Sequence, residues 1–144
     1  MTMPAQRSRT TKASPDRVWK VWSDTSTWPD WNPDVQSVEL SGPFQTGARG
    51  EMTTKSGGRH DIVIEDVQAG RTFTVDSTGV PTVHLRFKCE VVPEGSGARI
   101  SQAVSMRGGL SFLFQPMMSG RIADSFPALL DGLAAYAEKE TPAS

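Results

Sequence analysis

LFQPMMSGRIADSFPALLDGLAAYAEKE, residues 113–140, is the stretch that decides the fold. Its apolar side chains recur at steps of three or four residues, the period of one face of an α-helix: Met118, Ile122, Phe126, Leu129, Leu133 and Tyr136. The charged side chains fall mostly on the other faces, so the spacing predicts one long amphipathic helix from Leu113 to Glu140. Pro127 removes one backbone hydrogen bond inside it, and we therefore expect a kink near Ala123–Asp124.

The segments before this helix alternate in polarity with the period of two that is typical of β-strands. The alternation is clearest between Val83 and Val91, where apolar residues face one side and charged residues such as Arg86 face the other. The other predicted strands are a weak edge strand at 4–13 and runs at 35–41, 49–55, 60–67, 71–76 and 99–107. Because the links between them are short, neighbours in the chain should pair antiparallel. The sheet should turn its charged face to water and its apolar face to the helix.

Two short helices are predicted between the first strand and the rest of the sheet. Ser14 followed by Pro15 is a helix start signal, with serine as the N-cap and proline in the first turn. The segment Trp28-Pro29-Asp30-Trp31-Asn32-Pro33 is a stiff, aromatic-rich turn or single helical turn, because its prolines fix φ. The pattern predicts one α+β domain over residues 1–144. We expect a curved antiparallel sheet of about six to seven strands wrapped on the long C-terminal helix.

Composition excludes several classes of function. The chain has 144 residues, 37% of them hydrophobic and 22% charged, with a net charge of −1, as expected of a globular domain. Its basic residues are scattered, which argues against nucleic-acid binding, and no run approaches the ~20 apolar residues of a membrane span. The single cysteine, Cys89, allows no intramolecular disulfide and suits a reducing compartment. We expect a cytoplasmic monomer or homodimer without membrane insertion.

Three motifs resemble the START-like superfamily, also labelled SRPBCC or polyketide cyclase/dehydrase-like, whose architecture is the helix-grip fold. They are Ser14-Pro15 with Val18-Trp19, then Trp28-Pro29-x-Trp31-x-Pro33, and finally Leu130-x-x-Leu133-x-x-Tyr136-Ala137-Glu138. The resemblance implies a cavity between the sheet and the long helix that holds a lipid, an isoprenoid or an aromatic polyketide. It also implies an alternative function, because aromatase/cyclases and dehydratases share this architecture. A third possibility is a protein-interaction role.

The strand register and the helix period together identify the side chains expected to line such a cavity. Small residues are also expected to face inward, opposite Met52, Met106 and Met118, and this mixture favours a pocket over a solid core, since methionine adapts to irregular contents. These small residues are Gly50, Thr54, Ser77, Cys89 and Ala123. The expected lining is Trp28, Trp31, Met52, Ile64, Phe73, Val75, Leu85, Phe87, Gln102, Val104, Met106, Phe114, Met118, Ile122 and Phe126. The two tryptophans have an equally good structural interpretation, which is to hold the short helices in place.

Gln102 is the most informative polar residue, because it shares its strand face with apolar neighbours and should point inward. A buried amide needs a partner, which is a ligand oxygen, a backbone group or a water molecule. His84 shares the charged face of its strand, and His60 follows a glycine turn, so both histidines should be exposed. No ligand set for a metal is recognisable, and we expect no cofactor. No acid or base is predicted inside the cavity unless a bulge turns Glu51, Asp61 or Arg86 inward. Catalytic residues are therefore not identified.

Overall fold

The computed structural model describes residues 5–55, 57–80, 83–107, 124 and 126–139. The described elements begin with one strand and short helices, continue through the remaining strands, and end in a helix. In order they are β1 (Ala5–Thr11), α1 (Pro15–Ser23), the 3₁₀ helix η1 (Thr25–Thr27), α2 (Trp28–Trp31), β2 (Val35–Leu40), β3 (Arg49–Thr54), β4 (Arg59–Gln68), β5 (Thr72–Val80), β6 (Val83–Glu94), β7 (Gly97–Arg107) and α4 (Phe126–Lys139). The predicted order of elements is confirmed.

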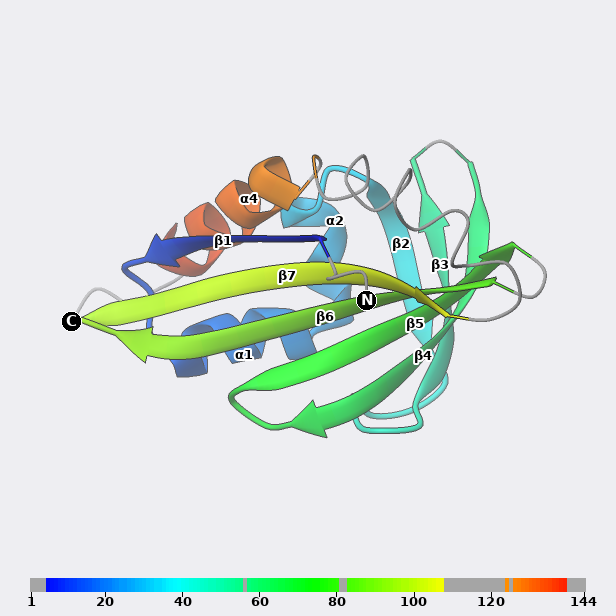
Figure 1. Cartoon of the computed structure of the whole chain (residues 1–144), viewed down its shortest axis with the longest axis horizontal. Coiled ribbons are helices and arrows are strands. Elements are labelled where there is room, and N and C mark those ends of the chain that lie inside the picture. The colour runs from blue at the N-terminus through cyan, green and yellow to red at the C-terminus, as the bar shows by residue number, and fades with distance from the viewer. Residues whose placement is uncertain (1–4, 56, 81–82, 108–123, 125, 140–144) are drawn as a thin grey trace.

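The strands form one seven-stranded antiparallel sheet in the order β1-β7-β6-β5-β4-β3-β2. From β2 to β7 the neighbours follow the chain, as short links dictate, and β1 joins beyond β7. Figure 1 shows the curved sheet with α4 running alongside β1 and α1 lying behind β6. Residues of α4 contact β1, and residues of α1 contact β6. The predicted α+β helix-grip architecture is confirmed.

The first helix begins where its sequence signal lies. The Ser14 hydroxyl accepts a hydrogen bond from the Arg17 amide at 3.1 Å, and Pro15 occupies the first turn. Asp24 ends α1 and caps η1 in turn, accepting from the Ser26 amide at 3.1 Å. These caps satisfy backbone donors that the first turn of a helix leaves unpaired. They also fix where α1 and η1 begin, and η1 leads directly into α2.

The C-terminal helix differs from its prediction at its start. Asp124 lies in a turn, and the described helix begins only at Phe126. One unbroken helix through Asp124, kinked or not, is therefore wrong. The reason lies in Pro127, which lacks the amide needed inside a helix but is tolerated in its first turn. Residues 113–123, the predicted first half of this helix, lie outside the described residues.

A glycine brings this helix close to the short helices. A Cβ atom built on Gly132 would overlap the carbonyl oxygen of Trp31. The missing side chain therefore lets α4 pack directly on the backbone at the end of α2. Leu129, Leu130 and Leu133 are buried beneath α4 and anchor it.

The outer face of the sheet is less exposed to solvent than predicted. Asp76 on β5 is buried and contacts two partners on β6: His84 Nδ1 lies 2.6 Å from its Oδ1, and Arg86 Nη1 donates to its Oδ2 at 2.8 Å. Arg86 also bonds Glu65 Oε2 at 2.6 Å. Burial alone would lower the pKa of Arg86, but the carboxylates of Glu65 and Asp76 raise it above its ordinary value. His84 is thus partly buried in an ionic cluster and not simply exposed.

Candidate functional site

A hollow of about 200 Å³ lies on the inner face of the sheet, beneath α2 and α4. Several side chains from the predicted lining surround it: Trp28, Trp31, Met52, Phe73, Val75, Leu85, Phe87, Gln102 and Phe126. Three of the small residues expected to face inward also belong to its wall: Thr54, Ser77 and Cys89. The wall further includes residues that were not in the predicted lining: Asn32, Asp34, Val35, His60 and Leu129. The walls thus come from both helices and from six of the strands.

The remaining residues of the predicted lining lie elsewhere or cannot be placed. Ile64 and Val104 are fully buried in the packed part of the core, and Met106 is buried outside the hollow's wall. Alternation along a strand gives the face on which a side chain lies, but it does not say how far along the strand the hollow extends. Phe114, Met118 and Ile122 fall outside the described residues.

Trp28 and Trp31 combine the two roles proposed for them. Trp28 Nε1 donates to the carbonyl oxygen of Trp22 at 2.9 Å, and Trp31 Nε1 donates to Thr27 Oγ1 at 3.1 Å. Because both indole N–H groups are used within the protein, the rings can offer only apolar surface to the hollow. They pin the short helices and form part of the wall at once.

Gln102 is buried, as its strand face predicts, and its amide is half satisfied. Cys89, its cross-strand neighbour, donates its thiol proton to Gln102 Oε1 at 3.5 Å. Burial raises the pKa of the Cys89 thiol, so the thiol stays protonated and keeps the role of donor. Among the described residues, no hydrogen-bond partner is recorded for the Gln102 NH₂ group. An oxygen atom of a ligand in the hollow could accept a hydrogen bond from this group.

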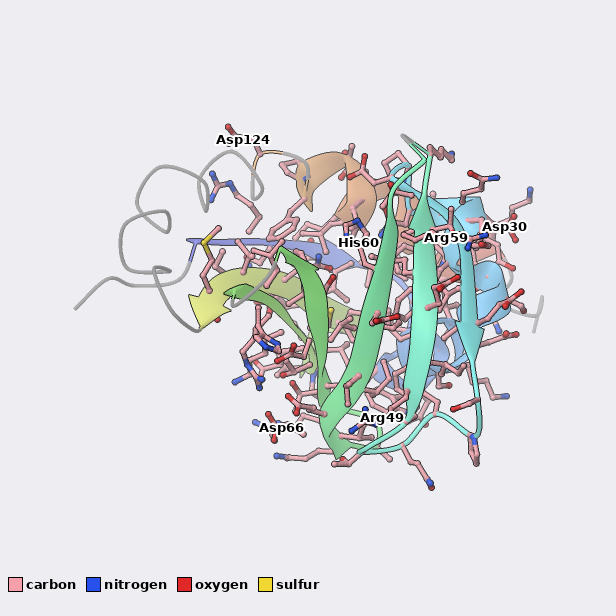
Figure 2. The ribbon with its side chains drawn as sticks, turned by 90° about the vertical axis from the view of Figure 1, so that its right-hand side faces the viewer. Asp30, Arg49, Arg59, His60, Asp66 and Asp124 are labelled. Carbon is pink, nitrogen blue, oxygen red and sulfur yellow. The ribbon has the colours of Figure 1, made fainter. Side chains whose placement is uncertain are left out.

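His60 is the main correction to the predicted site. Its predicted exposure is wrong: it is partly buried and lines the hollow. Its Nδ1 atom is buried, and no described residue forms a hydrogen bond with it. Figure 2 shows His60 on the side of β4 that faces α4, whereas Arg49 and Asp66 lie at the opposite end of the strands. His60 is the second residue of β4, which starts at Arg59 after the Gly57-Gly58 turn. Its alternation with Ile62 and Ile64 was the signal that could have identified it.

The charged candidates for inward orientation do not reach the hollow. Glu51 and Asp61 are exposed, and Arg86 belongs to the outer ionic cluster. The bulges lie instead at Val35/Ser37, Glu65/Gln68 and Ser77/Val80, so the register around Glu51 and Arg86 is regular. Within the described ranges, no group of His, Cys, Asp and Glu could hold a metal ion, and no helix is long and apolar enough to cross a membrane.

Comparisons with known proteins agree with this architecture. The family model described as "Polyketide cyclase / dehydrase and lipid transport" matches residues 4–138. No curated protein matches the chain.

Three solved structures have the same fold. Protein MLL2253 from Mesorhizobium loti superposes with a TM-score of 0.75 at 14% identity, over 97% of this chain and 100% of its own. Ara h 8.0201 reaches 0.75 at 15% identity, over 96% and 99%. Norcoclaurine synthase from Thalictrum flavum, in complex with dopamine and hydroxybenzaldehyde, reaches 0.74 at 16% identity, over 99% and 90%. Identities this low show a shared fold and leave the function to the residues of the hollow.

Proposed function

The chain belongs to the polyketide cyclase/dehydrase and lipid transport family, and we propose that it binds a small, largely apolar molecule in the hollow. The lining of the hollow carries this proposal. Its walls are built mostly from aromatic and aliphatic side chains, including Phe87, Phe126 and Leu129. Concave apolar sites with a few polar groups are typical of small-molecule binding.

Size narrows the class of ligand. The hollow measures about 200 Å³, below the ~300–1,000 Å³ usual for pockets that hold drug-sized ligands. One or two fused rings fit such a space better than a long acyl chain does. The aromatic walls also favour a ring, because edge-to-face and offset contacts between rings add to the energy of burial. Of the three ligand classes expected from the sequence, an aromatic or cyclic molecule is thus favoured over a linear lipid.

The polar side chains of the hollow narrow the class of ligand further. The unpaired Gln102 NH₂ group calls for an oxygen acceptor, and a carbonyl oxygen is the simplest one. Asp34 is exposed at the wall of the hollow, and no Lys or Arg of the described ranges lines it. A charged ligand would therefore lose its hydration without gaining a buried counter-ion. A neutral aromatic ketone or aldehyde meets these conditions.

Native mass spectrometry of the purified protein tests the proposal through any small molecule that co-purifies. Isothermal titration with 2-acetylnaphthalene supplies a defined probe, for which we expect saturable one-to-one binding. Gln102→Leu should weaken that binding by roughly 3- to 10-fold, the worth of one net hydrogen bond. The proposal fails if no small molecule co-purifies and no two-ring probe binds.

An enzymatic function is the second candidate, and His60 is the observation that favours it. Cyclisation and dehydration need a general acid or base inside the cavity, and His60 supplies a titratable group there. A catalytic His60 would make the turnover of a bound carbonyl compound bell-shaped or sigmoidal in pH, and His60→Gln would abolish turnover while leaving binding intact. Binding without conversion over days would favour a carrier.

A further inference from the structure

We propose that His60 is a second polar anchor in the hollow and selects ligands that carry a hydroxyl group in addition to the oxygen at Gln102. This inference rests on the proposed function and specifies the ligand class of the same site. The ligand would then be a hydroxylated aromatic ketone or aldehyde.

The neighbouring polar groups are already committed to local structure. Asn32 Oδ1 accepts a hydrogen bond from the Asp34 amide at 3.0 Å. Thr54 Oγ1 accepts from the Gly58 amide at 3.1 Å and so closes the β3–β4 turn. His60 differs from them, because its buried Nδ1 atom has no hydrogen-bond partner among the described residues. Since the atom is shielded from water, solvent does not satisfy it either, and the unpaired group costs about 1–3 kcal/mol.

The backbone around His60 leaves room for the ring. Gly57 adopts a φ of 97° in the turn, a conformation that glycine reaches without strain. A Cβ atom on Gly58 would lie 3.3 Å from His60 Nε2, tighter than ordinary contact. The glycine pair therefore gives the imidazole space beside the strand. The ring lines the hollow, and a rotation about χ2, which is broad for histidine, would turn the Nδ1 atom toward a ligand there.

A hydroxyl group fits this position better than other ligand groups. A neutral imidazole has one donor and one acceptor nitrogen, and a hydroxyl both donates and accepts, so it pairs with the ring in either tautomer. A carboxylate would lack a buried cation, because the described lining of the hollow contains no Lys or Arg. Gln102 lies on β7 and His60 on β4, with β6 and β5 between them. The two anchors thus belong to different walls, and apolar side chains such as Val75 and Leu85 lie between them.

The test is a double-mutant cycle between ligand groups and side chains. Naphthalene, 2-naphthol and 2-acetylnaphthalene would be titrated by calorimetry into wild type, His60→Phe and Gln102→Leu. We expect 2-naphthol to bind wild type roughly 3- to 10-fold more tightly than naphthalene. That gain should vanish in His60→Phe and persist in Gln102→Leu, while the gain of 2-acetylnaphthalene shows the opposite pattern. His60→Gln, which keeps a donor and an acceptor, should restore part of the preference for 2-naphthol.

The outcomes separate this inference from the proposed function. If no probe binds, the proposed function itself fails. If naphthalene binds but 2-naphthol gains nothing, or keeps its gain in His60→Phe, the anchor role of His60 is overturned and apolar binding stands. Should His60→Phe not fold, ¹⁵N spectra of histidine-labelled wild type decide the matter. Addition of 2-naphthol must then shift the His60 ring nitrogens more than naphthalene does, and equal shifts refute the inference.

Discussion

The interior of this protein has a closed end and a hollow end, built on the same face of one sheet. At the closed end, Trp19, Trp22 and Phe44 surround Phe73 with ring-centroid separations of 5.9, 5.3 and 5.0 Å and edge-on geometry. At the hollow end, Phe87 and Phe126 meet at 6.3 Å, and the rest of the wall includes the small side chains of Thr54, Ser77 and Cys89. Phe73 belongs to both ends.

The difference shows that apolar composition alone does not decide between core and cavity. Both ends are rich in aromatic residues, yet the closed end receives the indole of Trp22 directly from α1. Large rings in edge-to-face contact fill space at the density typical of interiors. The hollow end pairs aromatic residues with small ones, so its volume is not filled.

Trp22→Ala should produce the largest loss, because it opens a void where the interior is solid. Trp22 is fully buried, and large-to-small changes at such aromatic positions cost about 3–5 kcal/mol. Urea unfolding followed by circular dichroism measures the loss. Trp31→Ala, at the wall of the hollow, is the matched change and should cost less. Equal losses would contradict the division into two ends.

Gly132→Ala should destabilise the protein although alanine favours helices. Its Cβ would strike the Trp31 carbonyl, and relieving that overlap moves α4 away from α2 at a cost of about 1–3 kcal/mol. The control is Ala135→Gly on the exposed side of α4, which should cost about 1 kcal/mol from helix propensity alone. A more stable Gly132→Ala variant would show that α4 does not rest on this contact.

Ser77→Val should raise stability and lower ligand affinity together. Ser77 lies in the wall of the hollow, where added methyl groups fill empty space and stabilise by about 1 kcal/mol. At the closed end, Val18→Leu adds volume where Val18 is fully buried and should destabilise by about 1–3 kcal/mol. Thermal unfolding and titration with 2-acetylnaphthalene measure both effects. If both variants lose stability, the hollow end is already filled.

Glu138→Gln should have the smallest effect, and that effect should depend on pH. The Thr11 hydroxyl donates to Glu138 Oε2 at 2.7 Å, and this bond lowers the pKa of Glu138 while partial burial opposes it. A lowered folded-state pKa gives stability above the ordinary glutamate pKa of 4.5, and that stability is lost as pH falls through the folded value. At pH 7 the variant should lose at most about 1 kcal/mol. The unfolding curves of the variant and the wild type should differ at pH 7 and converge at pH 3. An equal difference at both pH values would contradict this role of Glu138.

Much of the fold was predictable because it depends on local signals. Ser14-Pro15 begins α1, alternation identifies the strands, and short links force neighbours to pair. The start of α4 was missed because Pro127 was interpreted as the cause of a kink inside the helix, whereas proline is favoured in the first turn of a helix. Cytoplasmic location, oligomeric state and the absence of nucleic-acid binding stay predictions.

The sequence by itself determined which face of each strand is apolar, since alternation follows from the geometry of the extended chain. It thereby placed Gln102 on the inner face. Only the tertiary structure decided that the Cys89 thiol bonds the Gln102 oxygen and that the space beside them stays open. It also decided that His60 turns inward, with no described residue bonded to its Nδ1 atom. These features arise from contacts between strands and helices far apart in the chain. Periodicity specifies a direction for each side chain, and only packing decides what that side chain meets.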